Sequence, residues 1–261
     1  MSLDQLNILL PTYLLAACRV AGVVAFAPVL SSTAIPRKIQ VTIALAITLG
    51  LLPALHDQHV AQLSPALFLC AALEFCFGIA IGMSANLVFL AAHWTGEMIG
   101  QQMGFTLSGL LDPHTGSESS VLGETYLAFA ALVFLLINGH HALIRALGAT
   151  FQSLPLLSIS LNRNLFDTFI GLLQSATILS LQLAAPLLLT MLIVDFSLGV
   201  MTRVVPQLNV MAMGMSLRSA VGLVLLLVLI ALTAKALGSA MTGWMRSLDL
   251  LWTPAAAGGL T

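Results

Sequence analysis

The amino-acid sequence predicts an all-α fold of the integral-membrane type. Hydrophobic residues make up 59% of the 261 residues and Asp, Glu, Lys and Arg only 7%, whereas about 25% of residues are charged in an average soluble domain. The apolar residues fall in long runs without the alternation of a transmembrane β-barrel. We expect about six hydrophobic helical segments: Ile8–Leu30, Ile39–Leu55, Leu63–Ala92, Thr125–Ile137, Phe169–Val205 and Ser219–Ala234.

The lengths of these segments are irregular for simple membrane spans, which need about 20 residues each. Ile39–Leu55 is short, and Thr125–Ile137 ends at the helix-breaking pair Asn138-Gly139. Phe169–Val205 is too long for one straight span and contains Pro186. Such lengths indicate helices that pack mainly on other protein.

Small residues recur at every fourth position after the third segment, at Ala92, Gly96, Gly100, Gly104 and Ser108. Steps of four place them on one stripe of a helix, where small side chains allow a second backbone to approach closely. A flexible tract is the alternative, because each Gly weakens a helix by roughly 1 kcal/mol relative to Ala. The strict spacing favours close helix packing.

A short loop, Leu107–Gly116, is expected to follow the stripe. Pro113 disfavours helix at Asp112, and Thr115–Glu118 has the spacing of a capping box that begins the next helix. We interpret residues around 104–116 as the best candidate for a moving part, because irregular backbone at membrane depth survives only if it is buried in protein or lines a water-filled path. The apolar tip could then act as a gate that excludes water, with glycines as hinges. A static loop that fills a gap between helices is the alternative. The gating residues are Gly104, Leu107, Gly109, Leu110, Leu111, Asp112 and Pro113.

Four charged residues lie within or at the edge of the apolar segments: Arg19, Glu74, Asp195 and Lys235. Each costs about 2.5–3.5 kcal/mol on insertion scales if it faces lipid at mid-depth. A proton or ion relay is one interpretation, and buried pairs that lock helices together are the other. We favour pairing, because no second carboxylate lies beside either acid in the sequence. Arg19 and Lys235 could also extend toward a membrane surface from the ends of their segments.

The sequence offers no catalytic, cofactor-binding or metal-binding constellation. The histidine pairs lack the spacing and acidic partner of a zinc site, and the cysteines lie inside apolar runs as small core residues do. No phosphate-binding glycine signature is present. The net charge of −1 and the lack of a long basic tract argue against nucleic-acid binding. We therefore expect a protein that is not an enzyme and has no cofactor.

Two parts of the chain are expected to meet at the Pro- and Ser-containing loop Ser153–Asp167. Residues 1–160 hold four of the segments, and residues 161–252 hold a helical hairpin and a short interfacial helix around Trp244 and Trp252. Residues 253–261 are expected to be a disordered tail. Between the hairpin helices, Arg203, Pro206, Gln207 and Asn209 predict a turn that docks on a partner; a plain hairpin turn is the alternative.

The stretch Asp195–Gly222 resembles the FliR family of flagellar export-gate subunits, above all in the run from Arg203 to Val210. Ser216 departs from the family pattern, which usually has Pro there. Three further pieces match in order: Phe26–Pro28 with Ile35–Lys38, Gly96–Gly104, and Leu135–His140. The resemblance therefore covers nearly the whole chain.

The resemblance implies a channel subunit. FliR-like proteins form, with FliP-like and FliQ-like subunits, the closed inner-membrane channel through which a type III secretion system exports unfolded flagellar proteins. It also implies a location in the flagellar basal body, contacts with FlhB-like and FlhA-like export components and with lipid, and an assembly largely above the membrane plane. A FliP-like part, residues 1–160, would precede a FliQ-like hairpin, and residues 104–116 would match the family's plug.

Two alternatives to a flagellar subunit stay open. The chain could be the corresponding subunit of a virulence-type injectisome. It could also be a stand-alone secondary transporter that uses Glu74 or Asp195 as its coupling carboxylate. We see no clear internal repeat of the kind that such transporters show.

Overall fold

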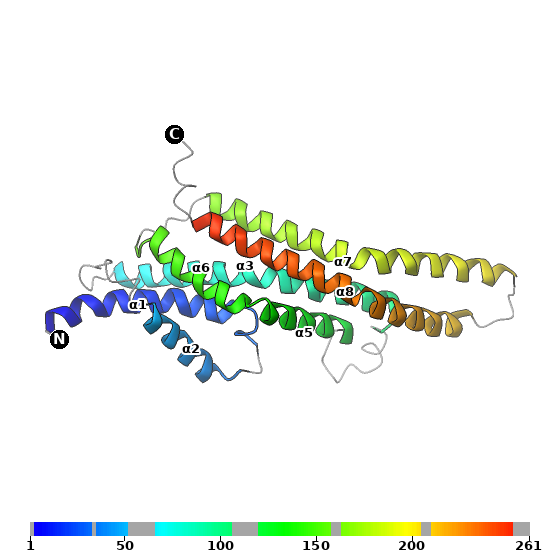
Figure 1. Ribbon diagram of the computed structural model, residues 1–261, viewed down its shortest axis with the longest axis horizontal. Coiled ribbons are helices and arrows are strands. Elements are labelled where there is room, and N and C mark those ends of the chain that lie inside the picture. Colours follow the sequence, from blue (N-terminus) through cyan, green and yellow to red (C-terminus); the bar gives the residue numbers. More distant parts are fainter. Residues whose placement is uncertain are drawn as a thin grey trace. The chain divides into compact units, whose positions relative to one another are not determined.

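The computed structural model describes residues 3–32, 35–51, 66–105, 120–157, 163–204 and 210–252. These residues form helices and no strands, which confirms the all-α prediction (Figure 1). The helices are α1 (Leu3–Phe26), α2 (Arg37–Gly50), α3 (Ala66–Met103), α5 (Val121–Leu136), α6 (Gly139–Ser153), α7 (Arg163–Val204) and α8 (Val210–Trp252).

Three helices are long and apolar enough to cross a membrane by length and composition: Leu67–Met103, Phe169–Val204 and Gly214–Ser247. The mean hydropathy of their most apolar windows is 2.0, 2.1 and 2.5. Helices α5 and α6 meet at a bend of 69° and together make a possible fourth, broken span. The described residues therefore contain three or four candidate spans, fewer than the number of apolar segments.

The break between α5 and α6 falls at Asn138, as the sequence predicts. Asn138 has φ 57° and ψ 36°, a left-handed conformation that Asn tolerates better than most residues. Helix α6 itself was not among the predicted apolar segments, because His140, His141 and Arg145 interrupt its hydrophobic pattern. Its buried side chains nevertheless share one helix face: Leu143, Ala146, Leu147, Thr150 and Phe151.

The short interfacial helix expected near the C-terminus is not a separate element. Helix α8 continues without interruption from Val210 to Trp252, and the Trp244 side chain on it is only 7% exposed. The Trp244 side chain therefore packs against other parts of this chain. Residues 253–261 lie outside the described residues.

The chain divides into two compact units that do not follow the chain order. The first comprises Met1–Leu87, Phe134–Leu172 and Met241–Thr261, and the second comprises Val88–Val133 and Leu173–Ala240. Each unit thus takes segments from both sides of the boundary expected near residue 160. The division into a FliP-like and a FliQ-like part stays a prediction.

The first unit is organised by a close crossing of α1 and the N-terminal half of α3. A Cβ atom at Gly78 would meet the carbonyl oxygen of Arg19 and lie 3.1 Å from the Cα of Gly22. Because neither glycine has a side chain, the two backbones touch at this point. Helix α2 packs on α1, and Gln40 of α2 donates a 3.0 Å hydrogen bond to the Leu30 carbonyl.

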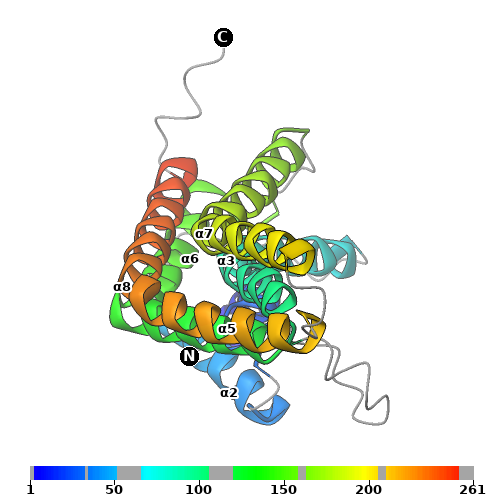
Figure 2. The same ribbon diagram turned by 90° about the vertical axis from the view of Figure 1, so that its right-hand side faces the viewer.

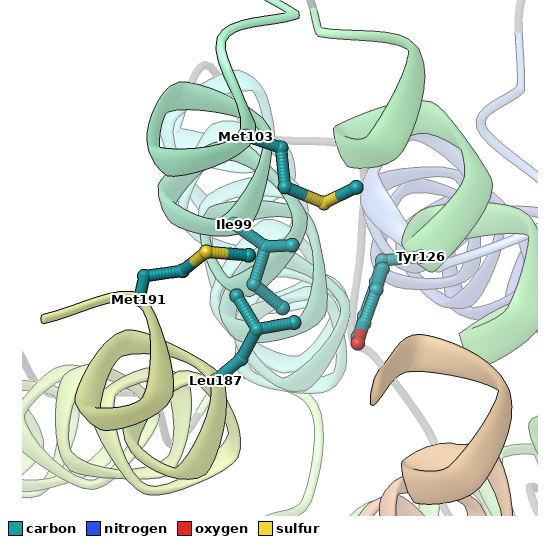
Figure 3. Packing of buried hydrophobic residues seen from close by; sticks show 5 residues of the cluster. All are labelled: Ile99, Met103, Tyr126, Leu187 and Met191. Atoms are coloured by element: carbon teal, nitrogen blue, oxygen red, sulfur yellow. The ribbon is translucent and has the colours of Figure 1, made fainter. Parts of the chain in front are cut away.

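The second unit brings together the C-terminal half of α3 with α5 and parts of α7 and α8. In the nearly end-on view of Figure 2, the end of α3 lies between α7 and the pair α5 and α8. Apolar side chains from three of these helices interlock, and Leu225 and Leu226 of α8 pack against them. The cluster, shown in Figure 3, consists of Ile99, Met103, Tyr126, Leu187 and Met191.

Candidate functional site

The small-residue stripe of α3 forms a tight contact with the start of α5. Ala92, Gly96 and Gly100 are all buried. A Cβ atom at Gly96 would collide with the Leu122 carbonyl oxygen and lie 2.7 Å from the Cα of Gly123, and one at Gly100 would collide with Ser120 Oγ. The spacing of four thus places backbone against backbone, the geometry expected of such a stripe.

Gly104 ends α3 and does not extend the stripe. Its φ of 82° lies in the left-handed region that Gly adopts without strain. The N–H of Phe105 donates to the Gly100 carbonyl at 3.0 Å, and the N–H of Gly104 donates to Gln101 at 3.1 Å. These two bonds define a Schellman motif, which satisfies carbonyls at a helix C-terminus. The expectation that Gly104 belongs to the helical stripe is therefore wrong.

The other residues assigned to the gating loop, and the last stripe position, lie outside the described residues. They are Leu107, Ser108, Gly109, Leu110, Leu111, Asp112 and Pro113. The expected capping box Thr115–Glu118 also lies outside. The described start of α5 uses Ser120 instead, whose Oγ accepts a 3.3 Å hydrogen bond from the N–H of Leu122.

Arg19 of α1 and Glu74 of α3 form a buried ion pair inside the first unit. Arg19 Nε donates to Glu74 Oε2 at 2.6 Å, and the two side chains are 0% and 1% exposed. The guanidinium carbon also lies 4.5 Å from the ring centroid of Phe151 and 5.2 Å from that of Phe77. Stacking on aromatic faces stabilises a desolvated Arg.

The same pair fastens the C-terminal end of α6. Arg19 Nη1 donates to the carbonyls of Thr150 (3.3 Å) and Leu154 (3.2 Å). Glu74 Oε1 accepts a 3.2 Å bond from the N–H of Leu157, a residue held at φ 72°. Carbonyls in the last turn of a helix lack partners within the helix. The pair therefore links α1, α3 and α6 rather than only two helices.

Asp195 and Lys235 are placed differently from Arg19 and Glu74. Asp195 Oδ1 of α7 lies 2.7 Å from Arg218 Nε of α8, and about a third of each side chain is exposed. Lys235 is exposed and has no ion-pair partner among the described residues, so its expected burial is a wrong prediction for this chain. It shares a face of α8 with the exposed residues Val228 and Leu232, which no other helix among the described residues covers.

Comparison with known proteins matches residues 10–243 to the family described as bacterial export proteins, family 1. This chain belongs to that family. The chain is 32% identical over 219 residues to the flagellar biosynthetic protein FliR of Escherichia coli (strain K12), covering 83% of each. It is 28% identical to FliR of Bacillus subtilis (strain 168), over 84% of this chain and 86% of the relative. It is 26% identical to the surface presentation of antigens protein SpaR of Shigella flexneri, over 77% and 78%.

Membership makes this FliR-family chain a component of a bacterial type III export apparatus and not an enzyme. Its long apolar helices agree with a place in the inner membrane. Among the described residues, no group of three His, Cys, Asp or Glu side chains could hold a metal ion. The adjacent rings of His140 and His141, with centroids 4.2 Å apart, lie against each other.

The expected docking turn of this FliR-family chain is described at one position. Arg203 is exposed in the last turn of α7, where a cation interacts favourably with the helix dipole. Pro206, Gln207 and Asn209 lie outside the described residues, and α8 begins at Val210.

Several contacts of the FliR-family chain were not predicted. The α1–α3 crossing at Gly22 and Gly78 was missed, although the four-residue step from Gly78 to Gly82 is the signal that identified the later stripe. Arg218, the ion-pair partner of Asp195, was not singled out in the sequence. Ser219, whose Oγ donates to the Met103 carbonyl at 3.0 Å, joins α8 to the end of α3.

Proposed function

We propose that the chain is the FliR-type subunit of a flagellar type III export gate. In this role it forms, with FliP-like and FliQ-like subunits, the inner-membrane channel for unfolded flagellar proteins. The observation that carries the proposal is the match to flagellar FliR proteins, at up to 32% identity, over more than four fifths of both chains. FlhB-like and FlhA-like components are the further partners that this role requires.

The apolar surface of the C-terminal helices supports a place in a larger helical assembly. Long stretches of α7 and α8 expose large hydrophobic side chains that the described part of the chain leaves uncovered. Monomeric soluble proteins rarely expose contiguous apolar surface of this kind. Partner helices and lipid are the two environments that can cover it. The most exposed side chains are Leu189, Leu192, Ile193, Phe196 and Val204 on α7, with Leu227 and Val228 on α8.

We further propose, on the sequence alone, that residues 104–116 act as the gate of this channel and that the turn with Arg203, Pro206, Gln207 and Asn209 docks on a partner subunit. The described contacts supply a fixed frame for the gate, because α3 ends in a capped turn at Gly104 and α5 begins on the surface of α3.

An injectisome subunit is the second candidate, favoured by the match to SpaR of Shigella flexneri. A stand-alone transporter is less well supported. A coupling carboxylate must exchange protons or ions, whereas Glu74 is 1% exposed and both of its carboxylate oxygens are engaged, by Arg19 and by the Leu157 N–H.

Deleting the coding sequence in the source bacterium tests the flagellar proposal. We expect cells without filaments and without export of hook and filament proteins, and a plasmid copy should restore both. Cells that keep their filaments but lose secretion of injectisome proteins would show that the second candidate is correct. Cells that lose neither would contradict both export roles.

A further inference from the structure

The start of α5 is held by a side chain from α3. Glu97 Oε1 accepts a 2.8 Å hydrogen bond from the backbone N–H of Ser120, the residue that precedes α5. N–H groups at the beginning of a helix have no partner within that helix. In a capping box, the acceptor for the N-cap N–H is a Glu or Gln three residues further along the same helix. Here that position is Gly123, which has no side chain, and Glu97 supplies the acceptor from another helix.

Gly123 makes room for this arrangement. A Cβ atom at Gly123 would lie 2.5 Å from Glu97 Oε1 and 3.2 Å from His93 Nε2. The missing side chain thus removes the usual capping residue and also opens the space that Glu97 occupies. The two features have one explanation if the carboxylate from α3 replaces the local cap.

The neighbouring charges lie too far away to substitute for this bond. His93 Nε2 is 3.8 Å from Glu97 Oε1 and 3.9 Å from Glu124 Oε1, beyond hydrogen-bonding distance. The Glu124 carboxylate is 59% exposed, and the bond between Glu124 and Ser120 runs from the Glu124 backbone N–H to the Ser120 carbonyl at 3.1 Å. Glu97 therefore acts on Ser120 through its acceptor oxygen, and the surrounding charges are secondary.

The stretch of α3 next to Glu97 also takes part in the cap at the C-terminal end of this helix. The Gly100 carbonyl accepts the hydrogen bond from the N–H of Phe105, which follows the last turn of α3. The Gly100 backbone lies directly against Ser120. Phe105 and Ser120 are the described residues on either side of 106–119. One short stretch of α3, from Glu97 to Gly100, thus anchors both of them.

We propose that Glu97 is a positioning residue that fixes the point at which α5 begins on α3. Its acceptor oxygen sets the place of Ser120 against α3. This assignment does not depend on the proposed function. Because the acceptor is what matters, Gln should replace Glu97 and Ala or Met should not.

Hydrogen exchange in the complex purified from native membranes tests this assignment. Peptides that cover Ser120–Tyr126 report the protection of the amides at the start of α5. Loss of this partly buried bond to a charged acceptor in Glu97→Ala should speed exchange of the Ser120 amide by about tenfold. Glu97→Gln keeps the oxygen and should stay within about twofold of the parent.

Glu124→Ala is the matched control, because it removes one carboxylate from the same cluster without touching the bond to Ser120. It should leave exchange at Ser120 close to the parent value. Glu97→Met, which keeps the side-chain length but offers no acceptor, supplies the loss variant if Glu97→Ala does not assemble.

Two results would overturn the assignment. Parent-like exchange in Glu97→Ala or Glu97→Met would show that the bond does not hold α5. Equally fast exchange in Glu97→Gln would show that the charge, and not the acceptor, is responsible. The exchange rates test the role of Glu97 on the purified chain even if no FliP-like partner is found. They can therefore contradict the assignment of Glu97 without contradicting the export proposal.

Discussion

Arg19 is a buried charged residue that bonds to several parts of the fold. Its side chain is fully buried, and it binds Glu74 and two carbonyls at the end of α6. Its Nη2 has no hydrogen-bond partner among the residues that the structure describes. A buried ion pair is not by itself a source of stability, because desolvation offsets the attraction of the charges. Replacing only one partner of such a pair is costly, because the charge of the other partner is then left alone in an apolar interior.

The first prediction concerns this pair. Arg19→Met should lower the free energy of unfolding by about 3–5 kcal/mol, whereas Arg19→Met with Glu74→Leu should recover much of that loss because no buried charge remains. The thermal unfolding midpoint of the detergent-solubilised complex measures both. Asp195→Asn, in a partly exposed pair, is the control and should cost about 1 kcal/mol or less. A double variant less stable than Arg19→Met alone and Glu74→Leu alone would refute the explanation that the unpaired buried charge causes the loss.

Helix α3 is the element on which both units depend, because it carries a glycine contact in each. Gly78 meets α1 in the first unit, and Gly96 meets α5 in the second. These contacts bring backbones together where lipid provides no hydrophobic drive between helices, so packing itself must hold them. The glycines are therefore more sensitive to added volume than their small size suggests.

The second prediction follows for Gly96. Gly96→Ala places a Cβ against the Leu122 carbonyl and Gly123, so it should destabilise the chain by about 1–3 kcal/mol despite the better helix propensity of Ala. Gly199→Ala in α7 has no atom within 4 Å of the new Cβ and should be neutral or slightly stabilising. Resistance to a protease during a temperature series compares the two. Equal protease resistance of Gly96→Ala and Gly199→Ala would mean that the α3–α5 contact is not tight.

The elements were predictable where the pattern was strong and local. Hydropathy and spacing alone predict the long apolar runs of α3, α7 and α8. They also predict the break at Asn138 and the stripe at Ala92, Gly96 and Gly100. Helix α6 was missed because His140, His141 and Arg145 interrupt its hydrophobic pattern and only a narrow stripe of the helix is buried. The end of α3 was set too late because Gly104 fits both a stripe of four and a helix cap, and spacing cannot separate them.

The partners of single charges could not be derived from the sequence. Arg19 meets Glu74 across 55 positions and Thr150 across 131, and no local rule connects such distant residues. Lys235 was misjudged because burial depends on which face of α8 another helix covers. Glu97 was noticed only within a family motif, since its role depends on the return of the chain at Ser120.

The molecule as a whole exposes more apolar surface on α7 and α8 than it covers, so its helices need further protein or lipid around them. An export channel also needs a seal, because an open pore would dissipate ion gradients. We propose, on the sequence alone, that residues 104–116 form that seal.

The third prediction tests the seal. Removing Gly109–Pro113 should let ions or small solutes cross the inner membrane, because an apolar constriction that excludes water is lost. Dye uptake and membrane potential in cells with the assembled complex measure the leak. Replacing the same five residues by a Gly-Ser stretch of equal length separates loss of the apolar tip from loss of length. An assembled deletion complex as tight as the parent would contradict gating.

The central claim is that this chain functions only as one subunit of an export channel. Purification of a tagged chain from native membranes in mild detergent, followed by mass spectrometry, tests it most directly. We predict that FliP-like and FliQ-like chains co-purify in one complex, and that the chain expressed without them is degraded or aggregates because its apolar faces and exposed Lys235 lack partners. A monodisperse, protease-resistant monomer without those chains would contradict the account.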